Sequence, residues 1–256
     1  MSRTSGSDRV AGMTPRPPIE LVPLPGRGRR YAGARRVYFG DTDPSGRLRL
    51  DALARMAQDI GNDDLADAGL DPASPWVTRR TSVWAPGAWP RLGEPLTLTT
   101  FCSGLGGRWG ERRTSVRSTG GAVELAAVWI HLDGTGRPAR LPQSFLDVFG
   151  ESAGDRRVST RLHHPPPPAT ASSRPWPLRA TDLDAFGHVN NPAVWMPVED
   201  EVARRRLVPR FAEIEYHVPI AADDEVALDA FGGDGGLRLW LTCDGGVRAS
   251  ALVVPG

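Results

Sequence analysis

The chain places an acidic turn after an apolar stretch twice: Asp41-Thr-Asp43-Pro-Ser-Gly46, and later Asp182-Leu-Asp184-Ala-Phe-Gly187-His188-Val-Asn190-Asn191. Both turns read Asp-x-Asp-x-x-Gly, and one offset of 141 residues aligns the three shared letters. Each turn is followed by a segment with helical spacing and then by several segments of β character. A unit that repeats in this way predicts two copies of one fold facing each other in a single chain.

Composition excludes several classes of protein. The 256 residues suffice for one large or two small domains, and a net charge of +1 gives no reason to expect nucleic-acid binding. No window holds the ~20 apolar residues of a membrane span, and the N-terminus lacks the apolar core of a secretory signal. Two cysteines, Cys102 and Cys243, predict no disulfide framework, so we expect a cytoplasmic protein.

The chemistry available to the chain is also limited by composition. Every basic residue is arginine, which removes Schiff-base chemistry on lysine. No cysteine and histidine residues have the spacing of a zinc site, and His163-His164 runs directly into four prolines, as a linker would. The sequence therefore predicts neither a metal nor an organic cofactor.

Four segments are expected along the chain. Residues 1–33 are rich in Pro, Gly, Ser and Arg and predict a disordered N-terminal segment. Residues 34–148 predict a first hotdog-like unit and 149–174 a Pro-rich linker. Residues 175–256 predict a second, shorter unit of the same kind.

The sequence of the first unit predicts a strand, then a helix, and then further strands. A helix is expected over Leu48–Ala68, because Leu50, Leu53 and Met56 recur at helical spacing and predict a buried apolar face. Strands are predicted over Arg35–Gly40, Trp76–Trp84, Pro95–Cys102, Arg108–Arg117 and Ala122–Leu132.

The second unit repeats this order in shorter form. A helix is predicted within Asn191–Leu207, with its start or a kink near Pro197. Strands are predicted over Trp176–Ala180, Phe211–Val218, Glu225–Phe231, Leu237–Thr242 and Val247–Val254. One apolar helix wrapped by an antiparallel meander is the hotdog arrangement. The predicted fold class is α+β, a double hotdog with two helix-wrapping antiparallel sheets in one chain.

The second acidic turn resembles a family signature. Asp182 to Asn191 is similar to the signature of the acyl-acyl-carrier-protein thioesterases of plants and bacteria, double-hotdog proteins that release fatty acids from the carrier. The first half resembles the bacterial members through Asp43-Pro-Ser-Gly46-Arg-Leu, Gly69-Leu70 and Val128-Trp-Ile-His-Leu-Asp133. Asp43-Pro-Ser-Gly46 also resembles the loop of the 4-hydroxybenzoyl-CoA thioesterases, in which the Asp before Pro is catalytic.

The sequence departs from the family pattern in two places. The family has Asn where this chain has Phe186. It also has an acidic residue and often a Cys a few residues after Glu-Tyr, where this chain reads Glu215-Tyr216-His-Val-Pro219-Ile. The resemblance therefore carries over Asp184 and His188, but not the Asn, the acid or the Cys.

Thioester hydrolysis needs a carboxylate that activates water or attacks the carbonyl, and donors for the developing oxyanion. Asp184 is the predicted base or nucleophile, with His188 as its orienting partner. The Gly187 region is predicted to polarise the carbonyl. Asp43 and Gly46 of the first turn are the reserve candidates. An Asp-x-x-Gly stretch can equally be a capped turn, in which Asp only bonds backbone N–H groups.

Further residues are predicted near the turns. Asn190 and Asn191 either bind substrate or cap a helix, with capping favoured for Asn191. Gln58 and Glu199 are related by the same offset of 141 on the two helices, and each is predicted to point across the pseudo-twofold axis toward the opposite turn. Glu199 would then face Asp43 and join it in catalysis. A solvated helix face is the alternative for both.

Three function classes fit these features. The leading one is hydrolysis of fatty acyl thioesters of acyl carrier protein, or of CoA, to release free fatty acid. The second is a hotdog enoyl hydratase or dehydratase. The third is a non-catalytic acyl-thioester-binding protein, which Phe186 and Pro219 favour. The expected partner is an acidic acyl carrier protein or a CoA thioester, met by an Arg-rich surface near one turn, and a homodimer is an expected assembly.

Overall fold

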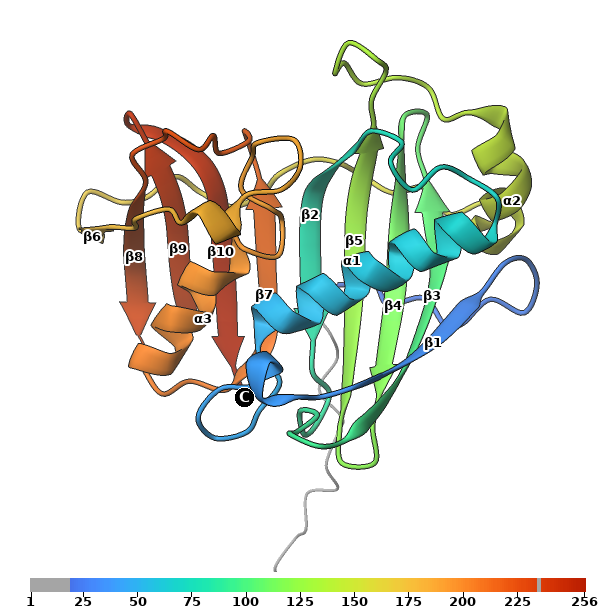
Figure 1. Cartoon of the computed structure of the whole chain (residues 1–256). Helices are drawn as coiled ribbons and strands as arrows, with labels where there is room; N and C mark the ends of the chain where they lie inside the picture. The colour runs from blue at the N-terminus through green and yellow to red at the C-terminus, as the bar shows by residue number, and fades with distance from the viewer. Residues whose placement is uncertain (1–18, 234–235) are drawn as a thin grey trace, which may run out of the picture.

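Within residues 19–233 and 236–256, which the computed structural model describes, the chain forms one ten-stranded antiparallel sheet (Figure 1). The strand order is β1-β3-β4-β5-β2-β7-β10-β9-β8-β6. The strands of the first half are β1 (Tyr31–Arg36), β2 (Trp76–Trp84), β3 (Pro95–Leu105), β4 (Trp109–Arg117) and β5 (Ala122–His131). Those of the second half are β6 (Ser172–Pro175), β7 (Pro209–Tyr216), β8 (Ala227–Gly233), β9 (Gly236–Cys243) and β10 (Gly246–Pro255).

The two halves are joined in the middle of this sheet. Strand β2 pairs with β7 in a register that runs from Arg80 opposite Glu215 to Trp84 opposite Phe211. The two half-sheets therefore continue into each other, and the predicted double hotdog is confirmed. In Figure 1 the helices α1 (Leu50–Asp67) and α3 (Trp195–Arg204) lie on the same face of the sheet, one against each half.

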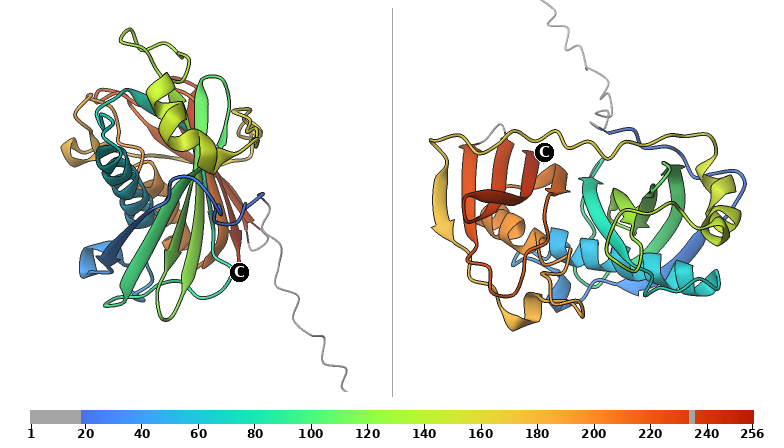
Figure 2. Two further views of the ribbon diagram at one scale, coloured as in Figure 1. Left: turned by 90° about the vertical axis from the view of Figure 1, so that its right-hand side faces the viewer. Right: turned by 90° about the horizontal axis from the view of Figure 1, so that it is seen from above.

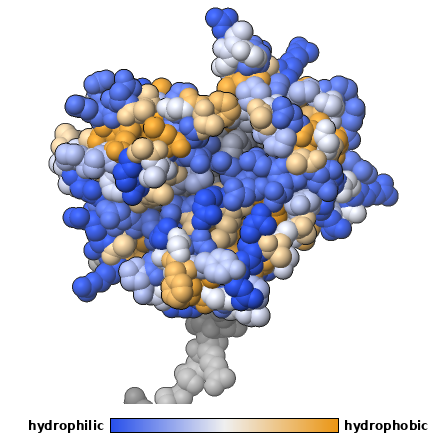
Figure 3. Space-filling model, viewed as in Figure 1, coloured by the Kyte–Doolittle hydropathy of each residue, from blue (hydrophilic) through white to orange (hydrophobic). Residues whose placement is uncertain are grey.

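Helix α1 forms because its apolar residues fall on one face. Leu50, Leu53, Met56 and Ile60 are buried and belong to a core shared with the inner face of both half-sheets. Helix α3 adds Trp195, Val198 and Val202 to the same core. The helix side of the molecule mixes hydrophilic and apolar residues at its surface (Figure 3). The predicted position of α1 is confirmed to within two residues at each end.

Helix α3 begins close to the predicted proline. Pro197 lies in its first turn, where the backbone N–H has no partner inside the helix, so proline does not interrupt it. The N-cap position is Val194, which provides no side-chain cap. The prediction that Asn191 caps this helix is therefore wrong.

Both edge strands lie elsewhere than predicted. Strand β1 is Tyr31–Arg36, not Arg35–Gly40, and Phe39–Asp41 form a 3₁₀ turn (η1). The Gly, Ala and Arg residues of β1 form no apolar pattern that would predict a strand. Strand β1 lies at the sheet edge and pairs only with β3. The other edge strand is β6, while residues 176–180, all within the described chain, form no strand. Trp176 and Leu178 pack against the core instead.

The segments before the first half and between the halves are more ordered than predicted. Residues 1–18 of the predicted disordered segment lie outside the described residues, and β1 begins within its remainder. A helix that was not predicted, α2 (Gln143–Ala153), buries Phe145 and Phe149 against Cys102 and Leu105 of β3. The following segment, residues 154–171, crosses the face of the sheet away from α1 and α3 (Figure 2).

Candidate active site

A pocket of about 290 Å³ lies between the second acidic turn and the C-terminal half of α1. The turn contributes Asp184, Phe186, Asn190 and Asn191. The first half contributes the other walls, among them Gln58, Gly61, Asn62 and Leu65 of α1, Trp76 of β2, Cys102 of β3, Arg112 of β4, Trp129 of β5 and Phe145 of α2. Polar groups of one half thus meet the sheet and helix of the other half in a single pocket.

The side chain of Asp184 holds its own turn with one oxygen. Its Oδ1 accepts the backbone N–H groups of Phe186 (N···O 2.9 Å) and His188 (3.3 Å). Among the hydrogen bonds of the described residues, Oδ2 of Asp184 accepts none. The capped-turn interpretation is therefore correct for the local geometry, and one carboxylate oxygen remains available to a ligand in the pocket.

Gln58 reaches the second turn from α1. Its Nε2 donates to Oδ1 of Asn190 at 3.3 Å, which confirms that Gln58 points across the pseudo-twofold axis. Oε1 of Gln58 is buried and has no hydrogen-bond partner within the described part of the chain. A buried acceptor without a partner is costly, so this atom is suited to bind a donor such as water.

Asn191 lies where the pocket continues inward. A narrow extension of about 30 Å³ passes between α1 and the sheet toward Thr78, Thr81 and Tyr216. The carbonyl of Asn191 accepts the Tyr216 hydroxyl at 3.3 Å. Burial raises the pKa of Tyr216, so its hydroxyl stays a neutral donor. The backbone N–H of Asn191 donates no hydrogen bond among those of residues 19–233 and 236–256.

Cys102 also borders the pocket, but its environment makes it a poor nucleophile. Burial raises the pKa of the Cys102 thiol to about 11, and a nearby Arg112 does not offset this. The reactive form of cysteine is the thiolate. At neutral pH Cys102 therefore acts as an apolar wall.

The first acidic turn has the same backbone geometry as the second, but both carboxylate oxygens of its Asp43 already accept hydrogen bonds. Oδ1 of Asp43 accepts the N–H of Ser45 (2.9 Å), the hydroxyl of Ser45 (2.7 Å) and the N–H of Arg47 (3.0 Å). Its Oδ2 accepts Nε of Arg47 at 3.0 Å. Burial favours a higher pKa for Asp43, but the bonds from Ser45 and Arg47 outweigh it and lower that pKa. A carboxylate paired in this way is a weak base with no oxygen left for substrate.

Arg47 links this turn to Glu199 of α3. The Arg47 guanidinium forms a buried ion pair with Glu199, whose Oε2 accepts the N–H of Leu50 at 3.0 Å. Burial raises the pKa of Glu199 despite the adjacent Arg47. Glu199 does reach the opposite turn, as predicted, but it holds the start of α1 and lies outside the pocket.

Three further sequence-predicted residues have structural surroundings that differ from those expected. The N–H groups of Gly46 and Gly187 donate to the carbonyls of Asp43 (2.9 Å) and Asp184 (3.1 Å), so neither is free for an oxyanion. Both glycines have positive φ, 84° and 78°, which explains their place in the turns. The ring of His188 is exposed and does not border the pocket.

Sequence reasoning missed several pocket residues. Asn62 and Leu65 lie one and two turns after Gln58 on α1, so the helical spacing from Gln58 could have identified them. Arg112 and Phe145 carried no such signal. Phe145 belongs to the unpredicted helix α2, and Arg112 is held by Asp64 of α1 at 2.5 Å.

Comparison with known proteins decides the family. A family model for the N-terminal domain of acyl-ACP thioesterases matches residues 28–149. The uncharacterized protein Rv2001 of Mycobacterium tuberculosis (strain ATCC 25618 / H37Rv) is 31% identical over 240 residues, covering 92% of this chain and 96% of the relative. This chain belongs to the acyl-ACP thioesterase family.

Solved structures agree on the fold of this thioesterase. The 12:0-ACP thioesterase from Umbellularia californica has a TM-score of 0.75 at 17% identity, covering 93% of this chain and 100% of that chain. An acyl-ACP thioesterase from Bacteroides thetaiotaomicron has a TM-score of 0.70 at 16% identity, covering 88% and 97%. The family and the fold support thioester hydrolase activity for this acyl-ACP thioesterase family member. No helix among its described residues is long and apolar enough to cross a membrane.

Proposed function

We propose that this thioesterase hydrolyses fatty acyl groups carried on acyl carrier protein, with Asp184 as the reacting carboxylate. One contrast carries the assignment of the site. Within the described chain, Oδ2 of Asp184 accepts no hydrogen bond and lies beside a pocket of about 290 Å³, whereas both oxygens of the equivalent Asp43 are bonded within a closed ion-pair cluster.

In the proposed reaction, Asp184 acts as a general base. A water molecule donates one hydrogen bond to Oδ2 of Asp184 and one to Oε1 of Gln58. Its oxygen attacks the thioester carbonyl carbon as Asp184 accepts the proton. The carbon–sulfur bond then breaks, and the proton passes to the departing thiolate. The products are a free fatty acid and the carrier thiol.

The carbonyl oxygen needs donors as its negative charge develops. With the Asn190 Oδ1 bonded to Gln58, the Asn190 Nδ2 is left to donate into the pocket. The N–H of Asn191, which has no acceptor among the described residues, is the second donor. These two groups replace the glycine N–H groups expected from the sequence.

The acyl tail extends in the other direction. The pocket is walled by Leu65, Trp76, Cys102 and Phe145 at the end where α1 meets α2. These side chains are apolar and would bury methylene groups of the chain. We therefore assign the polar turn to the thioester and the α2 side to the tail.

The test replaces each of the two acidic residues. Asp184→Asn should lower kcat for acyl-ACP hydrolysis by at least about 10²-fold, while Asp43→Asn should retain most of the turnover at temperatures where it is folded. Both proteins are checked by circular dichroism, and water addition to an enoyl thioester is measured in parallel. Near-native turnover of Asp184→Asn together with an inactive Asp43→Asn would place the reaction in the other half.

A further inference from the structure

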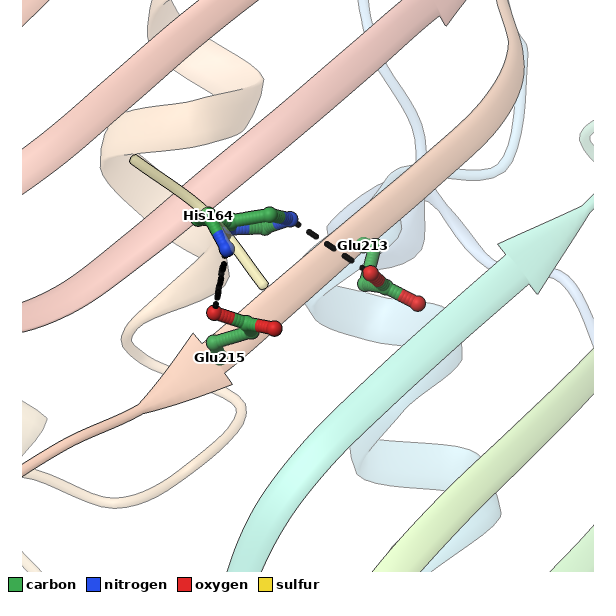
Figure 4. Close-up of side chains that lie close together, drawn as sticks. All are labelled: His164, Glu213 and Glu215. Carbon is green, nitrogen blue, oxygen red and sulfur yellow. Dashed lines mark hydrogen bonds and ion pairs between the residues drawn. The ribbon is translucent and has the colours of Figure 1, made fainter. Parts of the chain in front are cut away.

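Two carboxylates and an imidazole come together on the face of the sheet away from the pocket. Glu213 and Glu215 extend from β7, and His164 lies on the crossing segment 154–171 (Figure 4). One ligand-type atom from each residue lies within 4.8 Å of the other two. Nε2 of His164 is 3.4 Å from Oε1 of Glu213, and Nδ1 is 3.8 Å from Oε2 of Glu215.

His164 points an unpartnered nitrogen into this cluster. Its side chain is 9% exposed, and its Nε2 has no hydrogen-bond partner within the described residues. Nδ1 lies 3.0 Å from the hydroxyl oxygen of Ser250, which is also 3.1 Å from Nε2 of His217. When Ser250 donates to His217, His164 donates from Nδ1 to Ser250. In that tautomer the Nε2 lone pair faces a carboxylate oxygen, and a cation between these two acceptors would bind both.

The two carboxylates are held by hydrogen-bond donors and by one arginine beside Glu213. Glu215 is fully buried and accepts the backbone N–H groups of His163 (2.6 Å) and His164 (3.0 Å). Glu213 accepts the Ser82 hydroxyl at 2.5 Å, and the Arg80 guanidinium is 3.9 Å from its Oε2. Buried charges in proteins are normally paired or bound to a metal.

We propose that His164, Glu213 and Glu215 bind one divalent transition-metal ion, for which zinc has the fitting donor preference. An ion about 2.1 Å from both Nε2 of His164 and Oε1 of Glu213, which are 3.4 Å apart, would subtend an angle of about 108°, close to tetrahedral. The ion would fasten the crossing segment to β7. It is separate from the proposed hydrolysis at Asp184.

Space for entry and for water ligands lies beside the cluster. A pocket of about 200 Å³ is bordered by His164 and Glu213 together with Pro165, Arg238 and Trp240. A usable metal site needs an entry path as well as ligands. This pocket provides the path and leaves room for a water molecule as a further ligand.

The experiment measures Zn²⁺ binding to the full chain after EDTA treatment and desalting, by calorimetric titration. We expect one equivalent per chain and a rise in Tm on adding Zn²⁺. The near-isosteric changes Glu213→Gln and His164→Gln should each weaken binding by at least about tenfold. The matched control is His188→Gln, which alters an exposed histidine outside this cluster and its pocket and should bind as the wild type does.

Two outcomes would overturn the metal site. One is the absence of saturable binding to the wild-type chain. The other is equal affinity in the wild type, Glu213→Gln and His164→Gln, all shown to be folded, since the ion would then bind elsewhere. Because the cluster lies on the opposite face from Asp184, EDTA treatment should leave the thioester hydrolysis rate unchanged. Failure of the metal site therefore leaves the proposed hydrolysis standing.

Discussion

The fourth residue after each turn aspartate distinguishes the two turns. Asp43 and Asp184 cap the same kind of turn, and a glycine with positive φ follows each at the same distance. The next residue is Arg47 in one turn and His188 in the other. Arg47 folds back onto its aspartate and extends to the opposite helix, whereas the His188 ring stays in solvent. One side chain thus closes the first turn.

Gln58 should matter to the rate rather than to stability. Gln58→Leu removes both the bond to Asn190 and the acceptor at Oε1. The proposed water and the proposed oxyanion donor would then lose their positions. We expect kcat for acyl-ACP to fall on the order of 10²-fold with little change in Tm. The matched control is His188→Ala, which should keep near-native kcat because the ring does not border the pocket. The measurement is steady-state kinetics of both variants. A near-native kcat for Gln58→Leu together with a strongly reduced kcat for His188→Ala would contradict this site.

The Asp43 carboxylate should make the protein sensitive to acid. Its hydrogen bonds with Ser45 and Arg47 lower the folded-state pKa below the ordinary value of 3.8, although burial acts in the opposite direction. A pKa lowered by folding contributes stability that is present above the unfolded pKa and is lost as pH falls through the folded pKa. The Tm of Asp43→Asn should therefore approach that of the wild type as pH falls from about 5 to about 2. Ser45→Ala should show the same trend to a smaller degree, and a pH-independent Tm difference would contradict the assignment.

The sequence could predict which residues lie near the two acidic turns, but it could not predict the contacts that those residues make there. The common offset identified Gln58 and Glu199 as partners of opposite turns, and both contacts are present. It could not show that Glu199 forms an ion pair with Arg47 instead of facing the substrate, because that ion pair joins residues 152 positions apart. The glycine N–H groups were misjudged because the turn itself uses them.

At the scale of elements, the start of α1 depends on the buried pair between Arg47 and Glu199. Arg47→Met would leave Glu199 and Asp43 without their cation, and removing one partner of a buried pair typically costs about 3–5 kcal/mol. The double variant Arg47→Met with Glu199→Gln keeps an acceptor for the Leu50 N–H without the unpaired charge. We expect it to regain a large part of the lost free energy of unfolding, measured by urea denaturation. A double variant no more stable than Arg47→Met would contradict this role.

Elements with strong periodicity were predictable, and those at the edges were not. The α1 pattern and the strands with β-branched and aromatic residues lie within a few residues of their predicted ranges. Strand β1 depends on pairing with β3 alone, and its own sequence carries no apolar alternation. Helix α2 was not predicted; it spans the boundary between the predicted first unit, which ends at residue 148, and the predicted linker, and its buried Phe145 and Phe149 pack against residues of β3 that are distant in sequence.

At the scale of the whole molecule, we expect a carrier protein to dock beside the turn 132–140, which carries two exposed arginines. The turn 132–140 follows β5, and its backbone is bonded to Pro75 and His131 next to Trp76 at the pocket. Within the described chain, its exposed Arg137 and Arg140 form no ion pair. Acyl carrier proteins are expected to be acidic, so these charges would speed encounter at low salt.

The prediction compares two pairs of arginines. Replacing Arg137 and Arg140 with Ser should lower kcat/KM for acyl-ACP by about tenfold at low ionic strength, with a smaller effect at high salt. Hydrolysis of a neutral acyl-N-acetylcysteamine thioester should not change. The matched control replaces Arg157 and Arg161, exposed on the segment that crosses the opposite face. Equal losses in both variants, or a salt-independent rate, would exclude docking at this rim.

Joining both halves in one polypeptide has an evolutionary consequence. In a symmetric homodimer each substitution appears at two places at once, so a change that closes one site closes the other. Here β2 and β7 make that junction within a single chain, and positions 47 and 188 can mutate separately. One turn can therefore anchor a helix, as Arg47 and Glu199 do at the start of α1, while the other keeps Asp184 beside the pocket.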